Sequence, residues 1–424
     1  MPYYRSVGVV PRKRHTQFRR PDGGLYAEEL MGQEGFSSDS ALLYHRYPPT
    51  AIRSAEIYQP PATVVQPNLP LLPRHLRTHM LAAGPADAVL GRRPLLANAD
   101  VRIGYVVADR PSPLYRDAIG DECLYVEAGN ATIETTFGAL EVTTGDYVVI
   151  PTSVVHRIIP DDGPVRLLTI EATGHLGPPK RYLSARGQFL EHSPYCERDV
   201  RGPDEPLQVD GSDVEVYVKH RAASLPKPGL SVGGAESPPK PGLSVGGAEP
   251  LPKPGPSVGG GSWTRYVYAQ HPFDVVGWDG CLYPWAFSIH DFEPITGRVH
   301  QPPPVHQTFE GPNFVVCSFV PRKVDYHPLA IPVPYNHHNV DSDEMMFYTG
   351  GNYEARLGSG IEQGSISLHP GGFTHGPQPG AVERAIGAEF FDELAVMVDT
   401  FRPLELCEAA LSVEDAGYAW TWNR

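Results

Sequence analysis

The chain has 424 residues, with 35 Lys or Arg against 49 Asp or Glu, so its formal charge at pH 7 is −14. This length allows two or three domains, and an acidic balance without a long basic run argues against a nucleic-acid partner. The five cysteines are scattered and include no C-x-x-C pair, which argues against a disulfide framework or a zinc ribbon and fits a reducing compartment.

The N-terminus, MPYYRSVGVVPRKRH, contains no apolar core of signal-peptide length, and no run of eighteen apolar residues occurs in the chain. We therefore expect a cytoplasmic protein with no membrane partner. The 46 Pro and 43 Gly, together with many short β-branched runs, favour an all-β architecture with few short helices.

The N-terminal half divides into three predicted parts. Residues 1–60 are rich in Tyr, Arg, Pro and Gly, and predict an irregular arm with at most one helical turn. Residues 61–176 contain short alternating runs such as VRIGYVVA and DYVVIP, separated by Gly, Asp and Pro, which predict an antiparallel barrel or sandwich. Residues 177–225 are expected to connect this barrel to the rest of the chain.

Residues 226–262 contain a low-complexity repeat. PKPGLSVGGAE begins at Pro226, recurs at Pro239 and returns at Pro252 as PKPGPSVGG, a period of 13 residues. No copy has enough apolar residues to bury a core, and the Pro-Gly-Ser composition predicts a flexible linker. A docking motif is the alternative function for these repeats.

Residues 263–424 carry two spaced motifs between Pro334 and Pro379. The first is H-x-N-x4-E-x6-G and the second is G-x5-P-x-G-x2-H. They are made by His337, Asn339, Glu344 and Gly351, and by Gly364, Pro370, Gly372 and His375. This pair of motifs resembles the cupin barrels, and the glycine turns between them predict a strand pair.

Three of these residues form a candidate metal site. Two neutral imidazoles and one carboxylate, His337, His375 and Glu344, are the ligand set of non-haem Fe(II) oxygenases. His338 is adjacent and leaves the first ligand open to a shift by one residue; we assign His337 because Asn339 then keeps the H-x-N pattern.

The same motifs recur incompletely in the first barrel. Glu122 and His156 match, Ser153 replaces the inner glycine, and Tyr115 stands where the first histidine is expected. A facial triad cannot be built from Glu122 and His156 alone. We therefore predict a degenerate barrel kept for structure, with an independent metal site as the alternative.

Further segments identify a family. FDVVGWDGCLYPW, VHQPPP, HHNVDSDE, GNYEAR and HPGGFTHGPQPG together resemble homogentisate 1,2-dioxygenase. The resemblance implies a double cupin with Fe(II) in the C-terminal barrel. It also implies opening of the homogentisate ring with O2 to give maleylacetoacetate, in tyrosine and phenylalanine breakdown, and a homo-oligomer, a trimer or a hexamer.

The resemblance also implies roles for single residues. The iron ligands would be His337, Glu344 and His375, and the base for the substrate phenol would be His300. Tyr353 and His369 would contact the substrate. Asp341 and Asp343, where the family has neutral residues, could alter substrate preference.

Other functions stay open on the sequence alone. A cupin dioxygenase of another aromatic acid, such as gentisate, is the nearest alternative; a non-enzymatic double cupin and a zinc-dependent cupin isomerase are the others. Arg322 and Lys323 could pair with a substrate carboxylate or form a solvated turn. His271, His290 and His306 are expected to be structural or surface residues.

Overall fold

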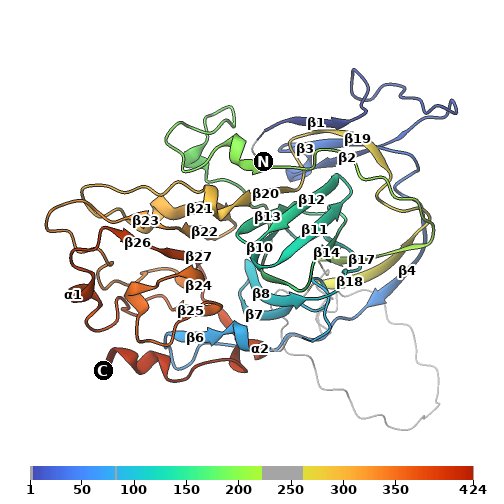
Figure 1. The fold of residues 1–424 in the computed structure, drawn as a ribbon. Helices are drawn as coiled ribbons and strands as arrows, with labels where there is room; N and C mark the ends of the chain where they lie inside the picture. Colours follow the sequence, from blue (N-terminus) through green and yellow to red (C-terminus); the bar gives the residue numbers. More distant parts are fainter. Residues whose placement is uncertain (1–2, 82–83, 222–260, 424) are drawn as a thin grey trace, which may run out of the picture.

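The computed structural model describes residues 3–81, 84–221 and 261–423. Two β barrels lie side by side, the N-terminal one in cyan and green and the C-terminal one in orange and red (Figure 1). The predicted all-β double cupin is confirmed; the α-helices among the described residues are short, α1 (Ala381–Ala385) and α2 (Glu408–Leu411). None of the helices in these ranges is both long and apolar enough to cross a membrane. The repeats that begin at Pro226 lie outside the described residues.

Two large sheets build the N-terminal barrel. The nine-stranded sheet runs in the order β16 (Val200–Arg201), β20 (Trp285–Ser288), β13 (Asp146–Ile150), β10 (Glu122–Ala128), β15 (Val165–Ala172), β8 (Val101–Ala108), β7 (Arg93–Ala97), β28 (Glu405–Cys407) and β5 (Val65–Gln66). The seven-stranded sheet runs β12 (Gly138–Thr143), β11 (Asn130–Thr135), β14 (His156–Pro160), β9 (Leu114–Asp117), β17 (Val214–His220), β18 (Ser262–Tyr268) and β4 (Ile52–Tyr58). Strand β12 shows why such segments form sheets around a core. Its residues alternate between buried and exposed, so one face of the strand lies in the core.

The C-terminal barrel is built on a six-stranded sheet. Its order is β21 (Gln307–Gly311), β22 (Phe314–Phe319), β27 (Glu393–Thr400), β24 (Asp343–Gly351), β25 (Ser365–His369) and β6 (Arg74–Arg77). A short pair, β23 (Arg322–Lys323) and β26 (Phe390–Phe391), lies beside it. The strand predicted for LAVMVDTF is β27, and the predicted strand pair between the two motifs is β24 with β25.

The N-terminal arm is more regular than its composition predicts. Three strands, β1 (Arg5–Gly8), β2 (Ala27–Gly32) and β3 (Ser40–His45), form a four-stranded sheet with β19 (Val275–Gly280), and β4 joins the N-terminal barrel. The prediction of an irregular arm is therefore wrong for these segments. Strands β1 and β3 form because β19, more than two hundred residues away in the chain, supplies their hydrogen bonds, and β2 then pairs with β3.

The predicted domain boundaries also need correction. Strand β6, assigned to the first barrel, completes the C-terminal sheet by pairing with β25, and it is the blue strand among the orange ones in Figure 1. Strands β18 to β20 and β28 lie almost wholly in the predicted segment 263–424, but they pair with strands of the N-terminal half. Strand periodicity predicts a strand but does not specify its partner, so these exchanges could not be read from the sequence.

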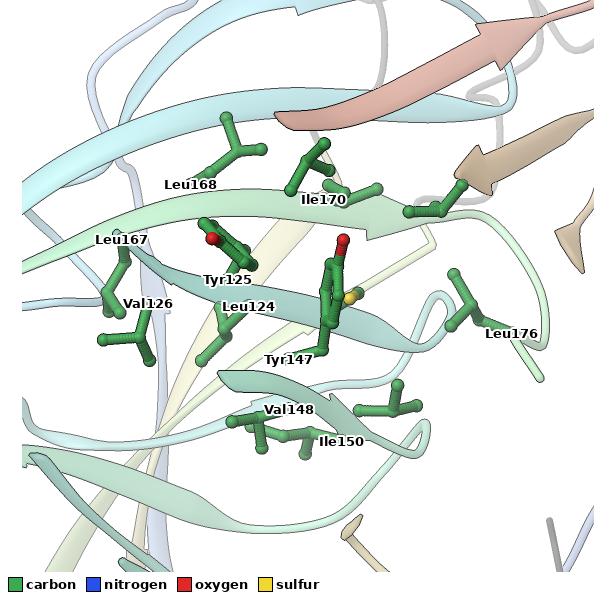
Figure 2. Packing of buried hydrophobic residues seen from close by; sticks show 14 of the residues in the cluster. Leu124, Tyr125, Val126, Tyr147, Val148, Ile150, Leu167, Leu168, Ile170 and Leu176 are labelled. Carbon is green, nitrogen blue, oxygen red and sulfur yellow. The ribbon is translucent and has the colours of Figure 1, made fainter. Parts of the chain in front are cut away.

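One hydrophobic core runs through both barrels. Figure 2 shows its N-terminal part, where Tyr125 and Tyr147 pack among the aliphatic side chains of β13 and β15. The Tyr125 hydroxyl donates to Thr349 Oγ1 at 3.1 Å, and the ring of Tyr147 meets that of Phe309 edge-on at 5.3 Å. Because both partners belong to the C-terminal barrel, these contacts fix the position of the second barrel against the first.

A buried histidine links the N-terminal arm to the segment that leads into β19. His45 on β3 is 1 % exposed, and its two ring nitrogens donate to Asp274 at 2.6 Å and Glu29 at 3.0 Å. Burial alone would lower the pKa of His45, but its hydrogen bonds to the Asp274 and Glu29 carboxylates outweigh burial and raise the pKa to about 9. The imidazolium is therefore the folded-state form at neutral pH.

This pKa predicts a pH-dependent stability. Because the pKa of His45 is raised in the folded state, protonated His45 stabilises the fold. This stabilisation is complete below the unfolded pKa of 6.5 and is lost as the pH rises through about 9. The shift corresponds to about 3 kcal/mol of unfolding free energy. In urea unfolding at several pH values, the difference between wild type and His45→Gln is expected to shrink by about that amount up to about pH 10. A difference independent of pH would show that His45 is buried uncharged.

Candidate metal centre

His337, Glu344 and His375 meet inside the C-terminal barrel. Their ligand atoms all lie within 4.8 Å of one another. Glu344 Oε2 is 4.0 Å from His337 Nε2, and Glu344 Oε1 is 3.6 Å from His375 Nε2. Within the described ranges, this is the one group of three such side chains that could hold a metal ion.

Backbone pairing brings the three residues together. His337 and His375 form an antiparallel bridge, with both N–H to O distances at 2.8 Å, although they are far apart in the chain. Glu344 lies near the start of β24, directly opposite His369 on β25. Gly372 takes a φ of 76° in the turn that leads from β25 to His375, a conformation that favours glycine.

Both candidate histidine ligands present Nε2 to the centre. The Nδ1 of His337 lies 2.9 Å from the carbonyl of Tyr335, and that of His375 lies 3.2 Å from the carbonyl of Phe373. Because a carbonyl only accepts, each Nδ1 carries the proton and each Nε2 keeps its lone pair. The Nε2 of His375 is buried without a hydrogen-bond partner. These are the features a metal ion would require, so the residues fit one.

Glu344 and His369 form a buried pair behind the triad. His369 is fully buried, its Nδ1 donates to Glu344 Oε1 at 2.8 Å, and its Nε2 accepts from the Tyr418 hydroxyl at 3.0 Å. Burial raises the pKa of Glu344, but the hydrogen bond from His369 and the nearby histidines hold it well below its usual value. The carboxylate is therefore ionised and fixed in direction, as a metal ligand needs to be.

A cavity of about 130 Å³ opens onto the triad. Its wall includes both His337 and Glu344, together with side chains from β22 to β24 and from the loop around residue 300. His300 lies at the exposed edge of this wall, where its Nδ1 is 3.0 Å from Asp325 Oδ2. The cavity therefore joins the candidate metal ligands to the histidine expected to act as a base.

Comparison with known proteins decides the family. Over 426 aligned residues the chain is 34% identical to the "Putative dioxygenase" of Saccharolobus solfataricus, covering 100% of this chain and 99% of that protein. The family model described as "Homogentisate 1,2-dioxygenase C-terminal" matches residues 298–424. Homogentisate 1,2-dioxygenase of Rhodopseudomonas palustris (strain BisB18) is 24% identical over 98% of this chain and 90% of its own length. The chain belongs to the homogentisate 1,2-dioxygenase family.

A solved structure covers much of the chain at lower similarity. The cupin 2 conserved barrel domain protein from Leptotrichia buccalis covers 77% of this chain and 96% of its own, with 10% identity and a TM-score of 0.31.

Two substrate contacts implied by the homogentisate 1,2-dioxygenase family lie away from the cavity. Tyr353 packs beside Tyr348 in a small buried cluster, and His369 lies behind Glu344; the cavity wall includes neither. His369 is placed to orient Glu344 rather than to touch a substrate in this cavity. Tyr348 and Arg356 line the wall instead.

Period-2 alternation could have identified Tyr348 from the sequence. Glu344, Met346 and Tyr348 are alternate residues of β24, so they point to one face, and all three line the cavity. Arg356 gives no such signal, because it follows β24 in a 3₁₀ turn that tertiary packing folds back.

His338, Asp341 and Asp343 lie around the ligands without joining them. His338 is exposed, and its Nδ1 is 3.4 Å from the Thr374 hydroxyl, so geometry favours His337 as the first ligand. Asp343 is buried and accepts from the backbone N–H groups of Gly371 and Leu404, both at 2.8 Å, which is a structural role. Asp341 is exposed.

His306 is more than a surface residue. It is buried in the cavity wall and stacks on Phe319 at 4.3 Å. Burial and the nearby Arg322 lower its pKa to about 3, so the ring is neutral at the cavity surface. No periodic pattern in the sequence points to it, because it ends a 3₁₀ turn, Pro303–His306.

In the N-terminal barrel a cation of the protein occupies the equivalent place. Tyr115 pairs with His156 as His337 pairs with His375, and Glu122 lies on β10 as Glu344 lies on β24. The buried guanidinium of Arg92 donates to Glu122 and, at 3.0 Å, to Glu171. The carboxylate that would face a metal is thus already neutralised, which agrees with the predicted degenerate barrel.

Proposed function

We propose that this protein is an Fe(II)-dependent dioxygenase that opens the ring of homogentisate to give maleylacetoacetate. The observation that supports this most is the His337–Glu344–His375 cluster at the end of a cavity, in a chain of the homogentisate 1,2-dioxygenase family. Two imidazoles and one carboxylate on one side of Fe(II) leave positions open for other ligands.

Fe(II) bound there would supply the redox chemistry that lets O2 react with a dihydroxylated ring. The protein supplies the remaining functions. His337, Glu344 and His375 would hold the ion, and His369 fixes the direction of the Glu344 carboxylate. His300 is exposed to solvent at the cavity edge and hydrogen-bonded to Asp325, so it is placed to take a phenol proton from an entering substrate.

A dioxygenase of another aromatic acid is the second candidate. Family membership and the triad favour a ring-cleaving dioxygenase, but they do not distinguish an acetate substituent on the ring from a carboxylate attached directly. Gentisate is the nearest compound of the second kind. The distinction therefore needs a substrate panel.

The proposed activity predicts oxygen consumption that depends on substrate and iron. The protein would be loaded with Fe(II) under anaerobic conditions and then mixed with oxygenated buffer and homogentisate, gentisate or hydroquinone. We expect uptake of one O2 per homogentisate, a ring-opened product and no uptake by the iron-free protein. Uptake with gentisate alone would favour the second candidate, and no uptake with any ring would contradict a dioxygenase.

A further inference from the structure

Arg356 is a buried cation in the wall of the cavity. It ends the 3₁₀ turn Glu354–Arg356 between β24 and β25, and only 9% of its surface is exposed. Its side chain lines the same cavity as Glu344 and Tyr348. Burial lowers the pKa of Arg356, but the neighbouring tyrosines and Glu344 outweigh this, so it stays charged.

Arg356 makes hydrogen bonds only to neutral groups in the described ranges. Its Nε donates to the Tyr348 hydroxyl at 3.1 Å and its Nη1 to the carbonyl of Gly376 at 2.8 Å. Tyr348 is on the strand that carries Glu344, and Gly376 follows His375, so the guanidinium is held in a fixed position relative to the metal ligands. No carboxylate oxygen of a described residue lies within 4.0 Å of it, and its Nη2 has no hydrogen bond among them.

The acidic side chains of this cavity are engaged elsewhere. Four of them have partners at 3.2 Å or less: Asp325 with His300, Glu344 with His369, Glu354 with Arg384, and Glu393 with Arg322. A buried charge that no counter-ion contacts directly is costly, because its hydration is only partly replaced. The cavity therefore has one buried guanidinium whose natural partner, a planar oxyanion, is not provided by the described side chains.

We propose that Arg356 binds the carboxylate of the substrate and so makes the site selective for aromatic acids over neutral phenols of the same shape. This inference rests on the proposed function. A guanidinium matches a carboxylate through parallel N–H donors, and its Tyr348 and Gly376 contacts hold it in advance of binding. The carboxylate end of the ring would then be fixed and the phenol end turned toward the triad.

Arg322 offers a matched comparison in the same wall. It also lines the cavity, but its Nη2 lies 3.1 Å from Glu393 and its guanidinium covers the ring of Phe319. Its charge is already neutralised, so it has less to gain from a substrate carboxylate. Lys323, the next residue, is exposed.

The test measures binding of two unreactive ligands to the Fe(II)-loaded protein without oxygen. The ligands are 4-hydroxyphenylacetate and its neutral amide, and calorimetry gives the affinity of each for wild type, Arg356→Met and Arg322→Met. We expect wild type to prefer the acid by roughly 10- to 100-fold, the range of a charge-assisted hydrogen bond pair. Arg356→Met is expected to lose this preference because its affinity for the acid falls while its affinity for the amide is unchanged. Arg322→Met is expected to keep the preference.

Other outcomes would overturn the assignment. If Arg356→Met binds acid and amide more weakly by the same factor, Arg356 has a structural role. If Arg356→Met keeps the preference for the acid, Arg356 does not contact the carboxylate. If Arg322→Met loses the preference, the carboxylate binds Arg322 instead. Wild type that does not distinguish acid from amide would also overturn it. Arg356→Gln, which keeps a donor for the Gly376 carbonyl but has no charge, replaces the Met variant if that variant does not fold.

The same proteins separate this inference from the proposed function. If wild type binds the acid through Arg356 but takes up no O2 with homogentisate, the proposed reaction fails and the carboxylate site stands. If homogentisate is cleaved while Arg356→Met keeps its acid preference and its KM, the reaction stands and the inference fails.

Discussion

Replacement of His375 by Ala is expected to leave a folded protein that retains little iron and consumes no O2. His375 supplies one of three ligand atoms, and its buried Nε2 has no other partner, so nothing nearby replaces it. The same result is expected for His337→Ala and for Glu344→Ala. Iron content by elemental analysis, the melting temperature and oxygen uptake with homogentisate would be measured on the same preparations.

The N-terminal barrel provides the control for this experiment. His156 is the counterpart of His375, and Glu122, 3.3 Å away, is engaged by Arg92. His156→Gln is therefore expected to keep one iron per chain and wild-type turnover. Two irons per wild-type chain, or loss of iron in His156→Gln, would contradict the assignment of the metal to the C-terminal barrel.

His300→Ala is expected to bind iron normally and to lose turnover by about 10²- to 10⁴-fold, the usual contribution of a positioned acid–base group. Its position supports this, because it borders the cavity and is oriented by Asp325 at 3.0 Å without joining the ligand cluster. Raising the pH should restore part of the rate, since a phenol with a pKa near 10 then arrives already deprotonated. Steady-state rates against pH, with iron content, check this.

His338→Ala is the matched control for His300. His338 is also an exposed histidine near the triad, but it does not line the cavity and does not belong to the ligand cluster. We expect its turnover to stay within about twofold of wild type, in line with a solvent-exposed substitution. A His300→Ala enzyme with full iron and normal turnover at neutral pH would show that His300 only stabilises its loop.

The sequence predicted that His337, Glu344 and His375 would lie close together, as they do, because their positions depend on local spacing. Two motifs, each with its own turn, place Glu344 near the start of β24 and pair His337 with His375 in an isolated bridge, and a one-residue shift to His338 would turn the side chain to the other face. The fold class followed in the same way from short alternating runs.

The part of the cavity wall outside β24 depends on contacts that no local pattern specifies. Arg356 reaches the cavity only because Tyr348 and Gly376, from two different segments, hold its guanidinium. Tyr353, three residues before Arg356, is implied by the resemblance to contact the substrate, but its side chain packs in the core beside Tyr348. The N-terminal arm shows the same limit, since β1 and β3 form where β19, far away in the chain, offers a hydrogen-bonding edge.

Strand exchange between the barrels ties their stabilities together. Strand β6 leaves the N-terminal half to extend the C-terminal sheet, while β28 from the C-terminal tail lies between β7 and β5 in the N-terminal one. Neither barrel can melt without removing a strand from the other. We therefore expect the molecule to unfold as one cooperative unit in a single transition, and the C-terminal barrel not to fold when it is excised without β6.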